Sequence, residues 1–495
     1  MNISKYKKNA IFNILGWLLP TVIFLLLTPY MINKLGVEGF GVVTIIQVVT
    51  GYMAMFNFGF SEAIIKSVAE NHERDDNHVM RILLVGFVLF ICVGLLGGLI
   101  IYFISDWLVY DLLQVPDDLK ADASAGLKIG SLIFFLQMIA EFYRGSAIGC
   151  QRFDIPNISR IIRISISGAL IVLALSNGGG IESVMEATLI GLLVGLLINI
   201  FWMNIIMPMK IVEGDYKVLF LEIFHFSKHI FSVRLTGMIS NKISHFFLGS
   251  MSSVANIALY EIPVRVGETG AVFMNRVLQV MYPSFSKLKK DGENDKIENM
   301  INSILSIQLL ISLPVMLMFV LEAETLLAIW INADFAEKSS GIILLVAITY
   351  LMSSLTNIHT FAAMSFDMPS IVAKYNFIRM IITLILVYPS IKYFGLIGAA
   401  SVLLISALQS IPFIYEVNKR IFGKNIYVHL SKAIIIHTVI ASIFYVIYEE
   451  LYKNTNLYHP AFVILFGMVH FLIVYFLGVT SEEDNARIKK LLFKS

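Results

Sequence analysis

Four charged residues recur at helical spacing inside one long apolar segment, residues 254–284. They are Glu261, Arg265, Glu268 and Arg276. At about 100° per residue these positions lie within about 80° of one another around a helix. Arg265 stands roughly 16 Å along the helix axis from the start of the segment, which is about half the thickness of a bilayer core.

The preceding apolar segment, residues 228–249, carries a second polar stripe. Arg234, Asn241 and His245 share one face of a helix there, and Lys242 is adjacent. Charges inside a bilayer are costly, so they usually face a water-filled cavity or a charged partner. Two neighbouring helices therefore each present cations.

These charges have two interpretations. The spacing of Glu261, Arg265 and Glu268 suits ion pairs within one helix, so the two glutamates could serve only as partners of Arg265. Arg234, Lys242 and Arg276 have no acidic residue three or four positions away, and for these cations we expect a cavity. A basic cavity indicates an anionic ligand, and arginine is suited to phosphate.

The composition requires a membrane around these helices. Of the 495 residues 57% are hydrophobic and 15% are charged, against about 25% charged in a typical soluble domain. The mean hydropathy is +0.79. The apolar content suffices for about fourteen bilayer-spanning helices of roughly 20 residues each. The composition disfavours a soluble enzyme, and it excludes a disordered chain, a collagen and a coiled coil.

Fourteen apolar segments can be delimited by charges, proline, glycine or asparagine. They cover residues 11–32, 40–64, 80–104, 124–148, 159–176, 181–208, 228–249, 254–284, 299–321, 340–363, 375–391, 396–416, 430–448 and 459–478. Small residues four apart, as in Gly94 with Gly98 and Gly191 with Gly195, predict close helix packing.

The connections between these segments differ in charge. With a cytoplasmic N-terminus, 26 of the 37 Lys and Arg residues fall in the cytoplasmic termini and connections, counted together with the adjoining segment ends, and five fall on the opposite side. This asymmetry follows the positive-inside rule. It predicts a multi-pass protein with both termini in the cytoplasm.

An internal repeat divides the chain. Phe153-Asp154-Ile155-Pro156-Asn157-Ile158 is echoed by Phe366-Asp367-Met368-Pro369-Ser370-Ile371, and Gly180-Ile181 is echoed by Gly395-Leu396 at a similar offset. Helices 1–6 then correspond to helices 7–12, and an even number per half gives both halves the same orientation. We expect an N-lobe at 1–208, an amphipathic surface linker at 209–227, a C-lobe at 228–421, and helices 13 and 14 with a cytoplasmic tail at 422–495.

Several kinds of site have no sequence motif here. No P-loop, HExxH, CxxC or dinucleotide-binding glycine motif occurs, so we expect no cofactor, no metal, no nucleic-acid partner and no enzymatic activity. The two cysteines, Cys92 and Cys150, are read as small core residues.

Three short motifs resemble those of the Wzx-type polysaccharide flippases. Leu35-Gly36-Val37-Glu38-Gly39-Phe40-Gly41 is similar to the family's LG-x-x-x-(Y/F)-G connection between helices 1 and 2. Asn57-Phe58-Gly59-Phe60 resembles its D/N-x-G signature near the end of helix 2, and Gly149-Cys150-Gln151-Arg152-Phe153 resembles its G-x-x-R/K-F after helix 4. Together with the fourteen helices, the resemblance covers essentially the whole chain.

The resemblance implies a place in the multidrug/oligosaccharidyl-lipid/polysaccharide exporter superfamily. It implies two six-helix lobes plus an appended helix pair, and a cavity that opens alternately to each side. It also implies a cargo of undecaprenyl-diphosphate-linked oligosaccharide, moved to the periplasmic leaflet of the bacterial inner membrane. A polysaccharide polymerase and a chain-length regulator are the partners expected in such a pathway, besides membrane lipid.

The sequence therefore predicts an all-α flippase for O-antigen or a similar polysaccharide. Arg234, Lys242, Arg265, Arg276 and Asn241 are the expected substrate-binding residues, and Glu261 or Glu268 is expected to bind a coupling H⁺ or Na⁺. An ion-coupled multidrug antiporter is the first alternative, although four cations against two acids in helices 7 and 8 disfavour it. A membrane polysaccharide polymerase is the second, disfavoured by the short outer connections.

Overall fold

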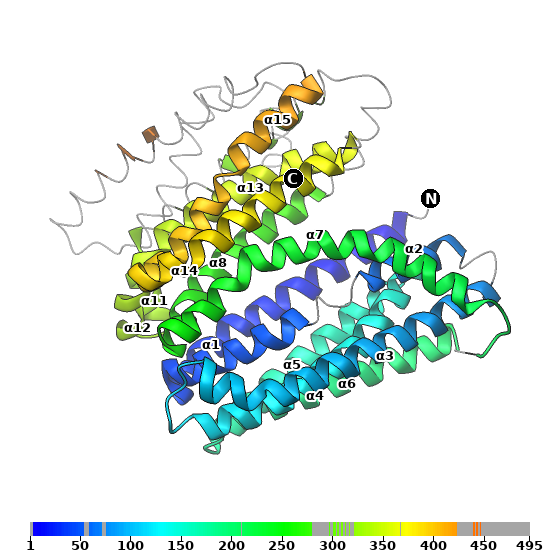
Figure 1. The fold of residues 1–495 in the computed structure, drawn as a ribbon, viewed down its shortest axis with the longest axis horizontal. Helices are drawn as coiled ribbons and strands as arrows, with labels where there is room; N and C mark the ends of the chain where they lie inside the picture. The colour runs from blue at the N-terminus through cyan, green and yellow to red at the C-terminus, as the bar shows by residue number, and fades with distance from the viewer. Residues whose placement is uncertain are drawn as a thin grey trace. The chain divides into compact units, whose positions relative to one another are not determined.

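A computed structural model gives the fold (Figure 1). It describes residues 3–53, 59–71, 76–208, 210–279, 321–366 and 368–422, with isolated positions at 297–316 and 439–446. Contacts divide the chain into two compact units, Met1–Glu261 with Ile391–Gly395, and Ile262–Ser390 with Leu396–Ser495. All secondary structure in the described ranges is helical, so the predicted all-α class is confirmed.

Helix α1 spans Ile3–Met53 and contains a break at Gly36. The φ of Gly36 is 73°, a left-handed conformation that glycine adopts without steric cost. The break falls in the connection expected between the first two apolar segments. The second segment was expected to continue to residue 64, but α1 ends at Met53 and a separate helix, α2, covers Phe60–Asn71.

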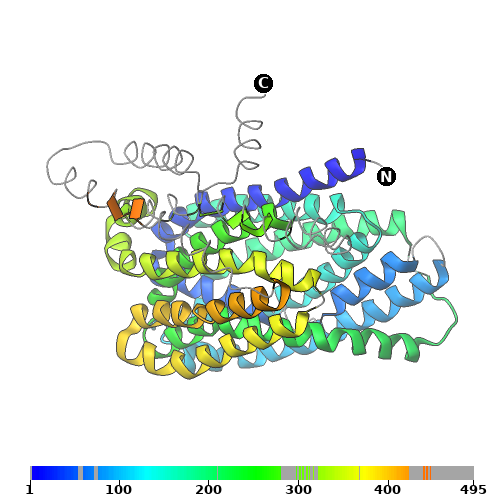
Figure 2. The same cartoon turned by 90° about the horizontal axis from the view of Figure 1, so that it is seen from above.

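The next four helices follow the predicted segments closely. They are α3 (Asp76–Trp107), which continues into a π-helical turn at Leu108–Leu112, α4 (Lys120–Gly149), α5 (Asp154–Ser176) and α6 (Ile181–Ile206). Figure 2 shows the same helices from above. The pairs α5–α6, α3–α4, α4–α6 and α1–α5 make the main contacts of the first unit.

Glycines set the distance between these helices. A methyl group on Gly98 would lie 3.1 Å from the Ser131 carbonyl oxygen of α4, and one on Gly195 would lie 3.3 Å from the Ser159 carbonyl oxygen of α5. Close packing at the spaced glycine pairs, predicted from the sequence, is confirmed.

Helices α7 (Tyr216–Met251) and α8 (Val254–Gln279) follow. The expected surface segment 209–227 has no helix end at its C-terminal boundary, because α7 runs without interruption through residue 228. Its exposed side chains include Val218, Leu221 and Phe224. Its position at a membrane surface stays a prediction.

The second unit contains five further described helices. They are α11 (Ala323–Trp330), α12 (Ala333–Ser339), α13 (Ile343–Ser365), α14 (Pro369–Ala407) and α15 (Ser410–Phe422). Helix α14 breaks at Gly395, where φ is 53°. This break separates the expected segments 375–391 and 396–416.

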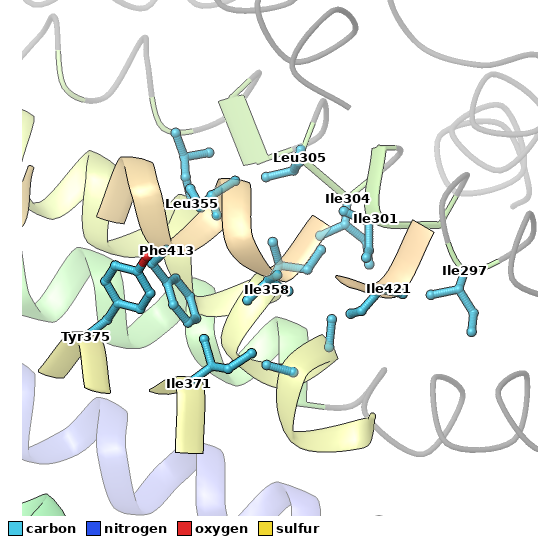
Figure 3. Close-up of a cluster of buried hydrophobic side chains, with 14 of the residues drawn as sticks. Ile297, Ile301, Ile304, Leu305, Leu355, Ile358, Ile371, Tyr375, Phe413 and Ile421 are labelled. Carbon is cyan, nitrogen blue, oxygen red and sulfur yellow. The ribbon is translucent and has the colours of Figure 1, made fainter. Parts of the chain in front are cut away.

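An apolar cluster forms the core of the second unit (Figure 3). It joins Leu355 and Ile358 of α13, Ile371 and Tyr375 of α14, Phe413 and Ile421 of α15, and Ile297, Ile301, Ile304 and Leu305. Burial of so many aliphatic side chains stabilises the helix packing through dispersion and close fit.

The two copies of the repeated motif lie at similar places, each at the junction between two helices. Helix α4 ends at Gly149 and α5 starts at Asp154, while α13 ends at Ser365 and α14 starts at Pro369. Asp367 of the second copy lies outside the described residues. The parallel orientation of the halves stays a prediction.

Seven segments of the described chain are long and apolar enough to cross a membrane. They are Leu18–Gly51, Asp76–Leu112, Lys120–Gly149, Asp154–Ser176, Ile181–Ile206, Ala333–Ser365 and Pro369–Phe422. The first and last each contain a glycine break, so each combines two predicted segments. The protein is therefore a multi-pass membrane protein. Most of segments 9, 13 and 14 lies outside the described residues.

Candidate functional site

Helices α7 and α8 form a hairpin that brings the two polar stripes together. The hydroxyl of Ser253 accepts from the backbone NH of Asn256 at 3.3 Å, at the first turn of α8. This is the hydrogen bond that an N-terminal capping serine makes. The hairpin packs closely on α1, because a methyl group on Gly41 would overlap the Val254 carbonyl.

A loop from the first half of the chain also holds this hairpin. The backbone NH of Gln114 donates to the carbonyl of Gly249 at 2.8 Å, and its side-chain amide donates to the carbonyl of Ser250 at 3.2 Å. Both carbonyls belong to the last turn of α7, whose carbonyl groups have no partner within the helix. The loop thus anchors the last turn of α7.

The centre of the hairpin contains a buried imidazole–carboxylate contact. Nε2 of His245 on α7 lies 2.6 Å from Oε2 of Glu261 on α8. The His245 side chain is fully buried and that of Glu261 is 6% exposed. The ring of Tyr260 packs edge-on against the imidazole, with centroids 5.2 Å apart.

Lys242 joins this pair from one helical turn away. Its Nζ lies 3.5 Å from the same Oε2 of Glu261. The Lys242 side chain is 22% exposed, and the neighbouring Asn241 is exposed. The group therefore runs from a buried acid–base pair to a cation that reaches the surface of the first unit.

The other sequence-predicted residues have different surroundings. Arg265 and Glu268 are exposed on α8, in the second unit. Arg234 and Arg276 belong to α7 and α8, but their side chains lie outside the described residues. Of the predicted set, the structure brings together Lys242 and Glu261.

His245 is the residue whose role the sequence did not reveal. Its place on the polar face of the first stripe was visible, but its partner was not, because Glu261 is 16 residues away and faces it only when the hairpin forms. A histidine three residues after a lysine on a membrane helix, followed by an acid on the next helix, was the available signal.

A second charged group lies on α2 and α4. Nε of Arg144 donates to Glu141 at 2.8 Å, and its Nη2 donates to the hydroxyl of Ser61 at 3.2 Å. Arg144 is thereby neutralised by a carboxylate one turn away. This favours a structural role at the end of α4.

No metal-binding set occurs in the described part of the chain, where three or more His, Cys, Asp or Glu residues nowhere cluster suitably. The chemistry available at the α7–α8 hairpin is proton exchange between His245 and Glu261 and attraction of an anion by Lys242. Neither requires a bound cofactor.

Comparison with known proteins identifies the family. The model of a family described as "Polysaccharide biosynthesis protein" matches residues 6–289, more than half of the 495 residues. The chain belongs to this family. A Shigella flexneri relative, provisionally named an O-antigen transporter, is 22% identical over 398 residues, which cover 79% of this chain and 93% of the relative.

Solved structures share the fold of this chain. The lipid II flippase MurJ in an inward closed conformation matches with a TM-score of 0.76 and 14% identity, covering 98% of this chain and 99% of that one. An inward-facing multidrug resistance MATE transporter matches with a TM-score of 0.67 and 13% identity, covering 82% and 94%. The transporter fold is thus shared by exporters with different cargoes.

Proposed function

We propose that the protein is a flippase for lipid-linked oligosaccharide. It moves undecaprenyl-diphosphate-linked repeat units from the cytoplasmic to the periplasmic leaflet of a bacterial inner membrane, for O-antigen or a similar surface polysaccharide. The observation that carries the proposal is the similarity to the Shigella transporter over 93% of that protein, within a polysaccharide biosynthesis family. These relationships make it a transporter rather than an enzyme.

The cationic stripes provide the substrate site. Lys242 and Arg265, with Arg234 and Arg276 on the same two helices, attract the diphosphate. Asn241 is exposed beside Lys242 and offers an amide to the same ligand. Charge-assisted hydrogen bonds from lysine or arginine to phosphate are among the stronger polar contacts in proteins, and phosphate is the part common to all lipid-linked repeat units.

Alternating access is the mechanism that fits this site. Fourteen helices would form two parallel six-helix lobes, 1–208 and 228–421, linked through 209–227 and followed by the helix pair and tail of 422–495. Rocking of the lobes would expose the cationic site to each leaflet in turn, with both chain termini in the cytoplasm. A polysaccharide polymerase and a chain-length regulator would act on the units after transfer.

Glu261 and Glu268 are the proposed coupling residues. Glu261 is buried against His245, whereas Glu268 is exposed. Glu261 is therefore the stronger candidate for binding an ion whose uptake changes the site.

A multidrug antiporter is the competing function, because a MATE transporter shares the fold. The family model and the Shigella relative favour the polysaccharide cargo over this alternative.

Deletion of the gene in its host tests the proposal. Loss of surface polysaccharide, accumulation of lipid-linked repeat units inside the cell and rescue by the wild-type gene would support it. Normal polysaccharide in a deletion strain without a second flippase, together with new drug sensitivity, would replace it by the antiporter.

A further inference from the structure

The two ring nitrogens of His245 have unequal freedom. Nδ1 lies 3.2 Å from the backbone carbonyl oxygen of Lys242, and a carbonyl can only accept a hydrogen bond. Nδ1 therefore carries a hydrogen. Whether Nε2 carries a hydrogen depends on its partner, Oε2 of Glu261, which lies 2.6 Å away.

A hydrogen bond forms between Nε2 of His245 and Oε2 of Glu261 when the two atoms share one proton. Either an imidazolium donates from Nε2 to a carboxylate, or a neutral imidazole accepts at Nε2 from a carboxylic acid. With a second proton, an imidazolium faces a neutral carboxylic acid, and with none, two acceptors face each other. Both side chains are buried, where an unsatisfied polar group carries a desolvation penalty. Uptake of a proton thus removes the charge of Glu261, and loss of the shared proton sets two acceptors against each other.

The charge of the same carboxyl group decides whether Lys242 has a counter-charge at this position. Its Nζ lies 3.5 Å from Oε2, so its counter-charge disappears when Glu261 becomes neutral. Lys242 is partly exposed, and a lysine side chain has a flexible stem that can carry the ammonium to another anion.

We propose that Lys242 exchanges partners between Glu261 and a phosphate group of the substrate, and that protonation of the His245–Glu261 pair selects the phosphate. The inference rests on the proposed function, because that function identifies the ligand as a diphosphate. It adds His245 to the site and assigns the coupling ion as H⁺.

The linkage has a definite sign. A proton on Glu261 releases Lys242, so acid pH tightens diphosphate binding. By reciprocity, bound diphosphate raises the proton affinity of the pair by the same factor. The effect is a property of binding and requires no particular direction of proton movement.

Other titratable and charged groups in this part of the chain could also make binding depend on pH, and the test must distinguish them from the His245–Glu261 pair. On the hairpin these are Tyr260 and, one turn beyond Glu261, Arg265. Helices α3 and α7 run side by side in the first unit. Gly214, just before α7, lies against Arg81 near the start of α3. At the other end, Gln114, which follows α3, donates a hydrogen bond to the last turn of α7. At the end of α1 and α3 nearest the turn between α7 and α8, the charged groups are Lys34, Glu38 and Asp106. Helix α2 also contacts α7, and its charged groups are Glu62, Lys66 and Glu70. Asp106 contacts Lys128 at 3.0 Å.

Binding of undecaprenyl diphosphate to the purified full-length protein tests the proposal between pH 5.5 and 8.5. The wild type should bind at least about fivefold more tightly at the acid end, the lower range of coupling between sites. E261Q should bind at pH 8.5 as tightly as the wild type does at pH 5.5. K242Q should bind weakly at both. E38Q and D106N, which change acidic residues outside the hairpin, should retain the wild-type pH dependence.

Three results would overturn the proposal. Equal affinities of wild type and E261Q at every pH would show that Glu261 does not compete for Lys242. Unchanged affinity in K242Q, or no binding to the wild type at any pH, would show that Lys242 has no phosphate partner. Rescue of surface polysaccharide by the wild-type gene in the deletion strain decides the proposed function separately, so either can fail alone.

Discussion

The backbone of Gly191 on α6 lies directly against the hydroxyl of Ser167 on α5. A methyl group on Gly191 would overlap that hydroxyl and would stand 2.7 Å from the carbonyl oxygen of Arg163. One turn further along, the hydroxyl of Ser159 donates to the carbonyl of Gly195 at 2.7 Å. The two helices therefore leave no room for a side chain at Gly191.

Gly191→Ala should therefore destabilise the protein, because α5 and α6 must separate or shift to admit the methyl group. Overpacking of this kind costs about 1–3 kcal/mol. Thermal unfolding of the detergent-solubilised protein measures the effect. Gly237→Ala is the matched control, since a methyl group there meets nothing within 4 Å and alanine favours the helix. An unfolding temperature of Gly191→Ala equal to that of the control would contradict the close packing.

Asp122 stabilises the start of α6 from a neighbouring helix. Its Oδ2 accepts from the backbone NH of Ile181 at 2.5 Å and its Oδ1 accepts from the NH of Glu182 at 2.9 Å. Asp122→Ala should cost about 1–2 kcal/mol of stability through loss of these caps. Asp118→Ala, at an exposed position four residues earlier, should be neutral. Equal losses in the two variants would argue against the cap.

Cys150 should resist alkylation in the folded protein. Burial raises the pKa of its thiol to about 11, and the thiolate is the reacting form. At pH 8 only about 0.1% is then ionised, and labelling should rise about tenfold per pH unit up to the pKa. In a C92S background, maleimide labelling compares Cys150 with an I211C/C150S variant, whose cysteine replaces a 91% exposed side chain. Similar rates for both would show that Cys150 is accessible.

Replacement of Arg265 should impair transport, whereas replacement of Arg420, an arginine in a surface ion pair, should not. Loss of a charge-assisted contact to phosphate costs about 1.5–3 kcal/mol, so Arg265→Ala should lower substrate affinity roughly tenfold or more. Arg420 pairs with Glu416 at 2.7 Å on the exposed side of α15, and Arg420→Ala should keep near-normal affinity. The readout is surface polysaccharide in the deletion strain at matched expression of each variant. Full rescue by Arg265→Ala would remove it from the site.

Much of the helical framework could be predicted from the sequence because most apolar segments are bounded by charges, proline, glycine or asparagine. The segment 181–208 and helix α6, Ile181–Ile206, agree within two residues. Gly36 and Gly395 mark the two breaks within α1 and α14, and both adopt positive φ.

The differences arise where local pattern does not decide. The end of α1 at Met53 and the separate start of α2 fall inside one apolar run, so hydropathy could not reveal them. The His245–Glu261 contact depends on how α7 folds back on α8, and no periodicity along either helix specifies which side chains meet across the hairpin.

Transfer of a lipid-linked oligosaccharide across a reconstituted membrane tests the central claim most directly. Proteoliposomes would carry the host's undecaprenyl-diphosphate repeat unit, and an external glycosidase would report the fraction in the outer leaflet. We expect the protein to expose the inner-leaflet units, with Arg265→Ala much slower than wild type and Arg420→Ala unchanged. Transfer no faster than in empty liposomes, from a correctly folded protein supplied with its own host's substrate, would contradict the account.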